Sequence, residues 1–141
     1  MVELSRREAL PPIIALHINH GLHEDANDWA AHCEAVASDL GVEFHERVVS
    51  VDAGASLEAQ ARDARYIVFE SFLSDGDVLL LGHQLDDHVE TVLFRLIRGA
   101  GPSGLAGIPE KRPLGRGLLM RPLLGKTRAQ IEDYAGSHEL D

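Results

Sequence analysis

The chain has 141 residues, 45% of them hydrophobic and 26% charged, which fits one globular domain rather than a disordered or fibrous protein. Thirteen Lys and Arg against 23 Asp and Glu leave a net charge of −10, which argues against a sequence-blind binder of polyanions. The single Cys33 excludes an internal disulfide and favours a reducing, cytoplasmic location. The apolar runs are far shorter than the roughly 20 residues of a membrane helix, so we expect no membrane contact.

Short apolar runs alternate with longer segments of helical periodicity along the first hundred residues. The short runs predict buried strands, and apolar residues three and four positions apart predict amphipathic helices. In chain order we expect the end of a helix at 2–10, a strand at 13–18, a helix at 25–40, a strand at 42–51, a helix from 56 to 72, a strand at 77–83 and a helix at 86–98.

Each predicted helix has one apolar stripe, which we expect to be buried. Strands that alternate with helices imply parallel crossovers, so the expected fold class is α/β, with a parallel sheet flanked by helices. The residues expected on the buried stripes are Trp29, Cys33, Val36 and Leu40 in the first helix, Leu57, Ala61, Ala64, Val68 and Phe72 in the second, and Val89, Leu93 and Leu96 in the third.

Two glycines and one serine are expected to mark helix ends, with Ser56 as an N-cap and Gly41 and Gly99 as stops. Glycine and proline become frequent after Gly99, so a long loop, ordered or mobile, is expected over about 99–120. A last helix is predicted at 127–138. Neither end of the chain has a clear boundary signal, which favours a piece of a longer protein.

Polar residues follow two of the predicted strands. His17, Asn19, His20 and Gly21 lie at the end of the first strand, and the segment 83–91 follows the third. Ligands of parallel sheets sit beyond the carboxyl ends of the strands, so the two clusters are expected to share one sheet edge. Gly21 would let the backbone approach a ligand closely, whereas the histidines could equally be packed or solvated.

Asp87 and Glu90 stand three residues apart at the start of a predicted helix, so their carboxylates share a face. Such a pair can hold an ammonium group or a hydrated Mg²⁺ ion. The alternative is a solvated first turn that the helix dipole favours. A zinc site is the weaker interpretation, because His83 with Asp87 is one ligand pair only, and we assign no metal ligand.

Arg62 and Arg65 lie on one side of the helix that begins at residue 56. Their guanidinium groups match phosphate oxygens and could stabilise charge on a phosphoryl group. The alternative, which the spacing alone favours, is a pair of exposed arginines that bind Glu58 or Asp63. Cys33 lies on an apolar stripe, which indicates a core thiol rather than a nucleophile.

Five segments of the chain occur in the order and spacing of a known family, and together they cover nearly its whole length. They resemble the bacterial tRNA(Ile)-lysidine synthase family, whose members are N-type ATP pyrophosphatases, or PP-loop enzymes. The segments are HINHGL at 17–22, EAQARDARY at 58–66, GHQLDDHVET at 82–91, RGAGPSGL at 98–105 and RPLL at 121–124.

The resemblance implies a Rossmann-like fold of the adenine nucleotide alpha hydrolase type and a two-step reaction. ATP, with Mg²⁺, adenylates cytidine 34 in the CAU anticodon of tRNA(Ile), and the amine of L-lysine then displaces AMP. The resemblance allows a homodimer. The roles that it implies are nucleotide binding for His17, Asn19, His20 and Gly21, catalysis for Arg62, His83 and Asp87, and lysine binding for Asp87 and Glu90.

The family's Ser-Gly-Gly-x-Asp-Ser phosphate loop and the strand before it do not occur in this sequence. Residues 1–141 are therefore expected to be a partial N-terminal ATP-pyrophosphatase domain that is inactive alone. Two alternatives stay open. One is another PP-loop modifier of tRNA, such as a cytidine thiolase, although the lone Cys33 argues against it. The other is a degenerate, non-catalytic module that binds nucleotides.

Overall fold

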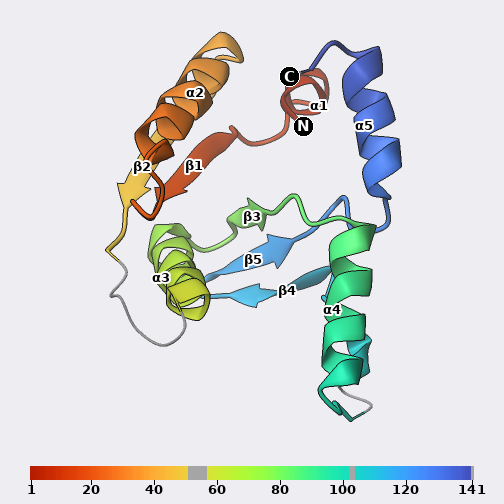
Figure 1. The fold of residues 1–141 in the computed structure, drawn as a ribbon. Helices are drawn as coiled ribbons and strands as arrows, with labels where there is room; N and C mark the ends of the chain where they lie inside the picture. The colour runs from red at the N-terminus through yellow and green to blue at the C-terminus, as the bar shows by residue number, and fades with distance from the viewer. Residues whose placement is uncertain (51–56, 102–103, 141) are drawn as a thin grey trace. The chain divides into compact units, whose positions relative to one another are not determined.

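The structure is a computed structural model that describes residues 1–50, 57–101 and 104–140. The chain forms two compact units, Met1–Val68 and Phe69–Asp141, and Figure 1 labels the elements. In chain order these are α1 (Val2–Arg7), β1 (Ile14–Asn19), α2 (Ala26–Asp39), β2 (Glu43–Val48), α3 (Leu57–Phe72), β3 (Val78–Leu80), α4 (Leu85–Ile97), the 3₁₀ turn η1 (Gly104–Ala106), β4 (Lys111–Leu114), β5 (Gly117–Met120) and α5 (Arg128–Ser137).

The first unit contains a parallel β1–α2–β2 crossover, as the alternation of patterns predicts. The two strands pair in parallel from Ile14 opposite Glu43 to Asn19 opposite Val48, and α2 contacts both of them. Gly41 ends the helix with a φ of +62°, because the left-handed conformation that closes a helix favours glycine. This stop was predicted, whereas the N-cap prediction at residue 56 lies outside the described residues.

The second unit is built on a three-stranded sheet of order β3–β5–β4 (Figure 1). β3 and β5 pair in parallel, and β4 and β5 form an antiparallel hairpin. Leu119 of β5 and Leu114 of β4 are its most buried apolar side chains. The α/β class is confirmed, while the strands form two sheets and the second is mixed.

The prediction of a loop over 99–120 is wrong, since η1, β4 and β5 lie within it. Gly115 and Gly117 belong to the β4–β5 hairpin: Gly115 takes a φ of +54° in the turn, and a Cβ on Gly117 would lie 2.7 Å from the Asp77 carbonyl oxygen. Pro113 lacks an N–H, and it lies on β4, an edge strand, where proline is tolerated. Frequent glycine and proline therefore mark a tight hairpin here.

The predicted buried stripe of α2 is wrong in its larger side chains. Trp29 is 53% exposed, and Val36 and Leu40 are also exposed, whereas Ala30 and Ala37 are the buried residues. Small side chains let α2 lie close to the strands, so alanine rather than the largest apolar residue marks the packed face. Cys33 is half-buried.

The apolar stripe of α4 is exposed as well, at Val89, Leu93 and Leu96. On α3 the stripe is mixed: Leu57 is exposed, Ala61 is buried, and the remaining positions are half-buried. Nowhere in the described ranges does a helix have both the length and the apolar character that a membrane span needs.

Candidate functional site

The residues that follow β1 form a turn held by the side chain of Asn19, which is only 4% exposed. Its Nδ2 donates hydrogen bonds to Asn27 Oδ1 at 3.2 Å and to Glu46 Oε1 at 2.9 Å. Its Oδ1 accepts one from the Gly21 N–H at 2.9 Å. Both amide hydrogens are thus used within the protein, so Asn19 shapes the turn rather than facing a ligand with its donors.

Gly21 has a φ of +60°, a conformation that strains other residues. Among the described residues, no heavy atom apart from those of its chain neighbours lies within 4 Å of the position that its Cβ would occupy. The glycine is therefore required by the backbone conformation rather than by crowding from these residues.

His20 and His17 are half-buried in the same region of the first unit. His17 stacks on Phe44, with 6.4 Å between ring centroids. Arg65 of α3 lies beside His20, with 3.3 Å between Arg65 Nη2 and His20 Nε2. Burial, followed by the charges of Arg65 and His17, lowers the pKa of His20 from its ordinary value of 6.5, so its imidazole is neutral at pH 7.

Arg62 is exposed on α3, and its guanidinium carbon lies 5.0 Å from the centroid of the Tyr66 ring. The salt bridges among described residues do not pair Arg62 or Arg65 with Glu58 or Asp63. The alternative of arginines neutralised on their own helix is therefore not what the structure shows. Arg62 is therefore exposed beside the Tyr66 ring, and its guanidinium has donors that match an anionic group.

Two of the three carboxylates at the start of α4 hold backbone N–H groups. Asp87 Oδ2 accepts from the N–H of Gln84, the N-cap residue, at 2.8 Å. Asp86 Oδ2 accepts from the N–H of Arg128, the first residue of α5, at 2.8 Å. Both bonds place an acid where N–H groups of a helix start lack helical partners. One oxygen of each carboxylate is therefore committed to the fold.

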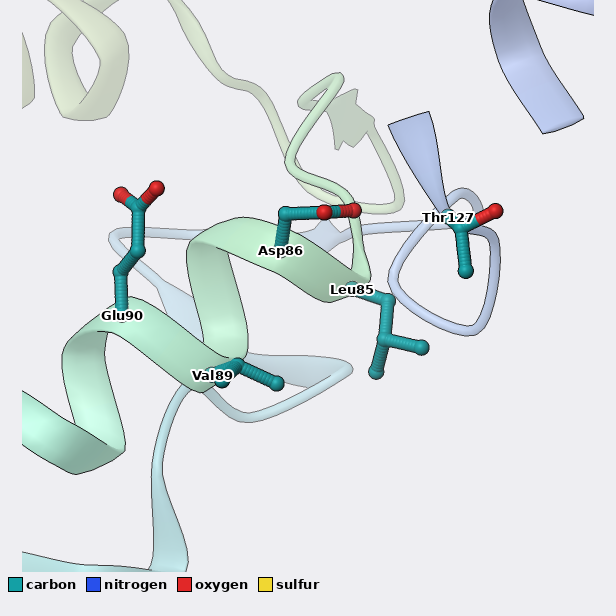
Figure 2. Close-up of a pocket in the computed structure, with 5 residues that line it drawn as sticks. All are labelled: Leu85, Asp86, Val89, Glu90 and Thr127. Atoms are coloured by element: carbon teal, nitrogen blue, oxygen red, sulfur yellow. The ribbon is translucent and has the colours of Figure 1, made fainter. Parts of the chain in front are cut away.

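A shallow hollow of about 230 Å³ lies beside these acids, lined by Leu85, Asp86, Val89, Glu90 and Thr127. Figure 2 shows Asp86 and Glu90 on the same side of α4, one turn apart. Asp87 does not line the hollow. The three-residue spacing predicted a pair of Glu90 with Asp87, whereas Glu90 and Asp86 line the hollow together, at the four-residue spacing that also shares a helix face.

His83 follows β3, and its Nδ1 lies 3.4 Å from Nε of Arg121, which follows the paired strand β5. Arg121 is 3% exposed and also donates to the Pro109 carbonyl at 2.8 Å. A guanidinium can only donate, so His83 Nδ1 is the acceptor of this hydrogen bond. Arg121 belongs to the RPLL segment, and no local spacing predicts its role, because its partner His83 is 38 positions away.

His88 and Arg95 of α4 form hydrogen bonds with the backbone of residues 107 and 108, which follow η1. The Nδ1 of His88 accepts from the Ile108 N–H at 3.2 Å, and Arg95 donates to the Gly107 carbonyl at 3.0 Å. Gly107 has a φ of +66°, and a Cβ there would lie 2.7 Å from His88 Nε2. His88 is thus a packing and hydrogen-bonding residue that sequence reasoning did not single out.

Across residues 1–50, 57–101 and 104–140, no three His, Cys, Asp or Glu side chains gather as ligands for a metal ion.

Comparisons with known proteins match the chain over its whole length. Residues 1–141 match a family model described as a PP-loop domain. The tRNA(Ile)-lysidine synthase of Pseudomonas aeruginosa is 52% identical over 141 residues, which are 100% of this chain and 32% of that protein. The synthase of Pseudomonas syringae pv. tomato is 52% identical over 96% of the chain and 30% of its own length, and that of Legionella pneumophila (strain Lens) is 48% identical over 91% and 30%. The chain spans about a third of the length of these relatives.

Proposed function

Because the chain belongs to the PP-loop domain family, we propose that it is the ATP-using part of a tRNA(Ile)-lysidine synthase. The observation that carries this proposal is the 52% identity to the Pseudomonas aeruginosa synthase over every residue of the chain. A PP-loop domain has the adenine nucleotide alpha hydrolase type of fold, and the parallel β1–α2–β2 crossover agrees with it. We also propose a cytoplasmic location, and a homodimer as the assembly.

The proposed reaction has two steps. The oxygen on C2 of cytidine 34, in the CAU anticodon of tRNA(Ile), attacks the α-phosphorus of ATP, and pyrophosphate leaves. The ε-amine of L-lysine then forms a bond to C2 while the bond from C2 to the AMP oxygen breaks, and the amine loses a proton. The product changes the codon that the tRNA reads.

In the first unit we propose that the turn at 19–21 binds ATP. His17 precedes the turn, His20 lies within it, and Asn19 fixes its shape; among the described residues, none beyond its chain neighbours fills the position of a Gly21 Cβ. Arg62 would contact the nucleotide phosphates, because charge develops on the phosphoryl oxygens during adenylation and a guanidinium stabilises it.

In the second unit we propose that Glu90 and Asp87 bind the lysine substrate through its amine. Glu90 is exposed beside the hollow, and Asp87 keeps one carboxylate oxygen beyond its bond to Gln84. Two carboxylates near an amine favour its ammonium form, which binds it but must lose a proton before attack. We propose that His83, whose Nδ1 accepts from Arg121, takes part in catalysis at this site.

Mg²⁺ enters this proposal as the ion that accompanies the phosphates of ATP and neutralises their charge. The described residues gather no metal cluster of their own, so we assign no protein ligand to it. Positioning and electrostatic stabilisation by the chain's own donors carry the proposed catalysis.

The test is a chimera in which residues 1–141 replace the matching segment of the Pseudomonas aeruginosa synthase. With tRNA(Ile) and labelled ATP, the chimera should release pyrophosphate and form an adenylated tRNA before lysine is added. Release of inorganic phosphate with ADP instead would contradict a PP-loop reaction. A chimera that binds ATP but does not adenylate the tRNA would favour the degenerate binding module.

A further inference from the structure

The two ring nitrogens of His20 have different surroundings. Nε2 lies 3.3 Å from Nη2 of Arg65, and since a guanidinium has no acceptor, Nε2 must accept this hydrogen bond. A neutral imidazole has one N–H, which is then on Nδ1. In the described part of the chain Nδ1 is shielded from solvent and has no hydrogen-bond partner. The structure therefore contains a buried donor without an acceptor.

Such a donor is unusual, because leaving a buried polar group unpaired destabilises a protein by about 1–3 kcal/mol. An acceptor supplied by a ligand would remove this cost. His20 stands directly after β1, at the carboxyl end of a parallel strand, where ligands of α/β sheets bind. Among the described residues, none beyond its chain neighbours fills the position of a Cβ on the adjacent Gly21.

The charged and titratable groups beside His20 indicate what kind of acceptor fits. Arg65 and His17 both disfavour a positive charge on the imidazole, and burial acts in the same direction. A phosphate at Nδ1 would instead favour the imidazolium form and would work against these groups. An uncharged acceptor, such as a ring nitrogen of the base or a ribose oxygen, is matched to a neutral N–H donor.

We infer that Arg65 holds His20 as its Nδ1–H tautomer, and that this N–H donates a hydrogen bond to an uncharged acceptor on the nucleoside part of the bound nucleotide. The ligand in this inference rests on the proposed binding of ATP, whereas the tautomer does not. Arg65 is thus a positioning residue, which acts through His20 rather than on the nucleotide.

The tautomer is tested without ligand, by a long-range ¹H–¹⁵N correlation spectrum of the histidine-labelled chain at pH 7.5, with His20→Gln to assign the signal. We expect the pattern of an Nδ1–H imidazole for His20. Arg65→Gln should convert it to a mixture of tautomers, while Arg7→Gln, which removes an exposed arginine paired with Glu8, should leave it unchanged. An Nε2–H pattern in the unmodified chain would overturn the inference.

The acceptor is tested in the chimera that carries residues 1–141, labelled on histidine and glycine, by adding ATP, adenosine or inorganic triphosphate. ATP and adenosine should both shift the His20 Nδ1 resonance, and triphosphate should not. If ATP shifts the Gly21 amide but leaves His20 Nδ1 unmoved, or if triphosphate alone reproduces the shift, the inference is wrong and nucleotide binding stands. If ATP shifts no resonance of the chain, the proposed nucleotide binding fails, and the assigned acceptor fails with it.

Discussion

Glu90→Gln separates substrate binding from folding, because the Glu90 carboxylate makes no hydrogen bond or ion pair recorded among the described residues. The amide keeps the size of the side chain and removes its charge. A hydrogen bond between an ammonium group and a carboxylate contributes about 1.5–3 kcal/mol. Since Glu90 is exposed, we expect the lower end of this range, which corresponds to about a tenfold rise in the KM for lysine.

The assay measures lysine-dependent lysidine formation by the chimera, together with the affinity for ATP and the urea midpoint. The free energy of unfolding should change by less than about 0.5 kcal/mol, as for other exposed sites, and ATP affinity should persist. Glu132→Gln makes the same change at an exposed site on α5 and should alter nothing. An unchanged KM for lysine in Glu90→Gln would refute the assignment.

Asp87→Asn should behave differently from Glu90→Gln, because the Asp87 carboxylate also accepts from the Gln84 N–H. Removing the negative charge of Asp87 at the start of α4 weakens this capping interaction, so the variant should lose about 1 kcal/mol of stability. It should also form less lysidine. Equal stability of the two variants would contradict the capping role.

Three further outcomes follow from particular residues. Gly107→Ala should destabilise the chain by about 2–4 kcal/mol in urea titrations, because φ is +66° and the side chains of His88 and Val92 fill the position of the new Cβ. Gly76→Ala has a φ of +87° but no described neighbour at its Cβ position, so it should destabilise the chain by about 1 kcal/mol. Gly125→Ala should have almost no effect on stability. An equal loss in the free energy of unfolding for Gly107→Ala and Gly76→Ala would contradict a steric clash of the new Cβ at position 107. The folded state lowers the pKa of His20, so the unfolded state binds more protons between that lowered pKa and 6.5. The free energy of unfolding should therefore fall as the pH is lowered through this window, and His20 should add no pH dependence above it. This dependence should weaken in His20→Gln, and identical pH profiles of the variant and the unmodified chain would contradict the prediction. Arg62→Ala in the chimera should slow adenylation, and a normal burst of pyrophosphate would count against its role.

Local patterns predicted the elements of the first unit well. The apolar run before His17 and the left-handed Gly41 correctly placed β1 and the end of α2. The prediction of which face of α2 is buried was wrong. It placed the large apolar residue Trp29 in the core, whereas the small Ala30 is buried, because a small side chain lets the helix lie close to the strands. The spacing of a helix pattern gives its period, but which side chains are buried depends on what the helix packs against.

The contacts that shape the candidate sites join residues far apart in the sequence. The Asp86 carboxylate accepts a hydrogen bond from the N–H of Arg128, which is 42 positions away, and His83 accepts one from Arg121, which is 38 positions away. No local spacing predicts such pairs. The β4–β5 hairpin was not predicted, for a related reason. Gly117 is needed there because a Cβ would collide with the carbonyl oxygen of Asp77, which is distant in the sequence. The roles of the candidate residues toward ATP and lysine stay predictions.

The most direct measurement of the central claim is incorporation of labelled lysine into tRNA(Ile) by the chimera that carries residues 1–141. The account predicts incorporation that requires ATP and a cytidine at position 34, with one AMP formed for each lysine bound. A chimera that folds and binds this tRNA, but transfers no lysine under conditions where the Pseudomonas aeruginosa synthase does, would contradict it.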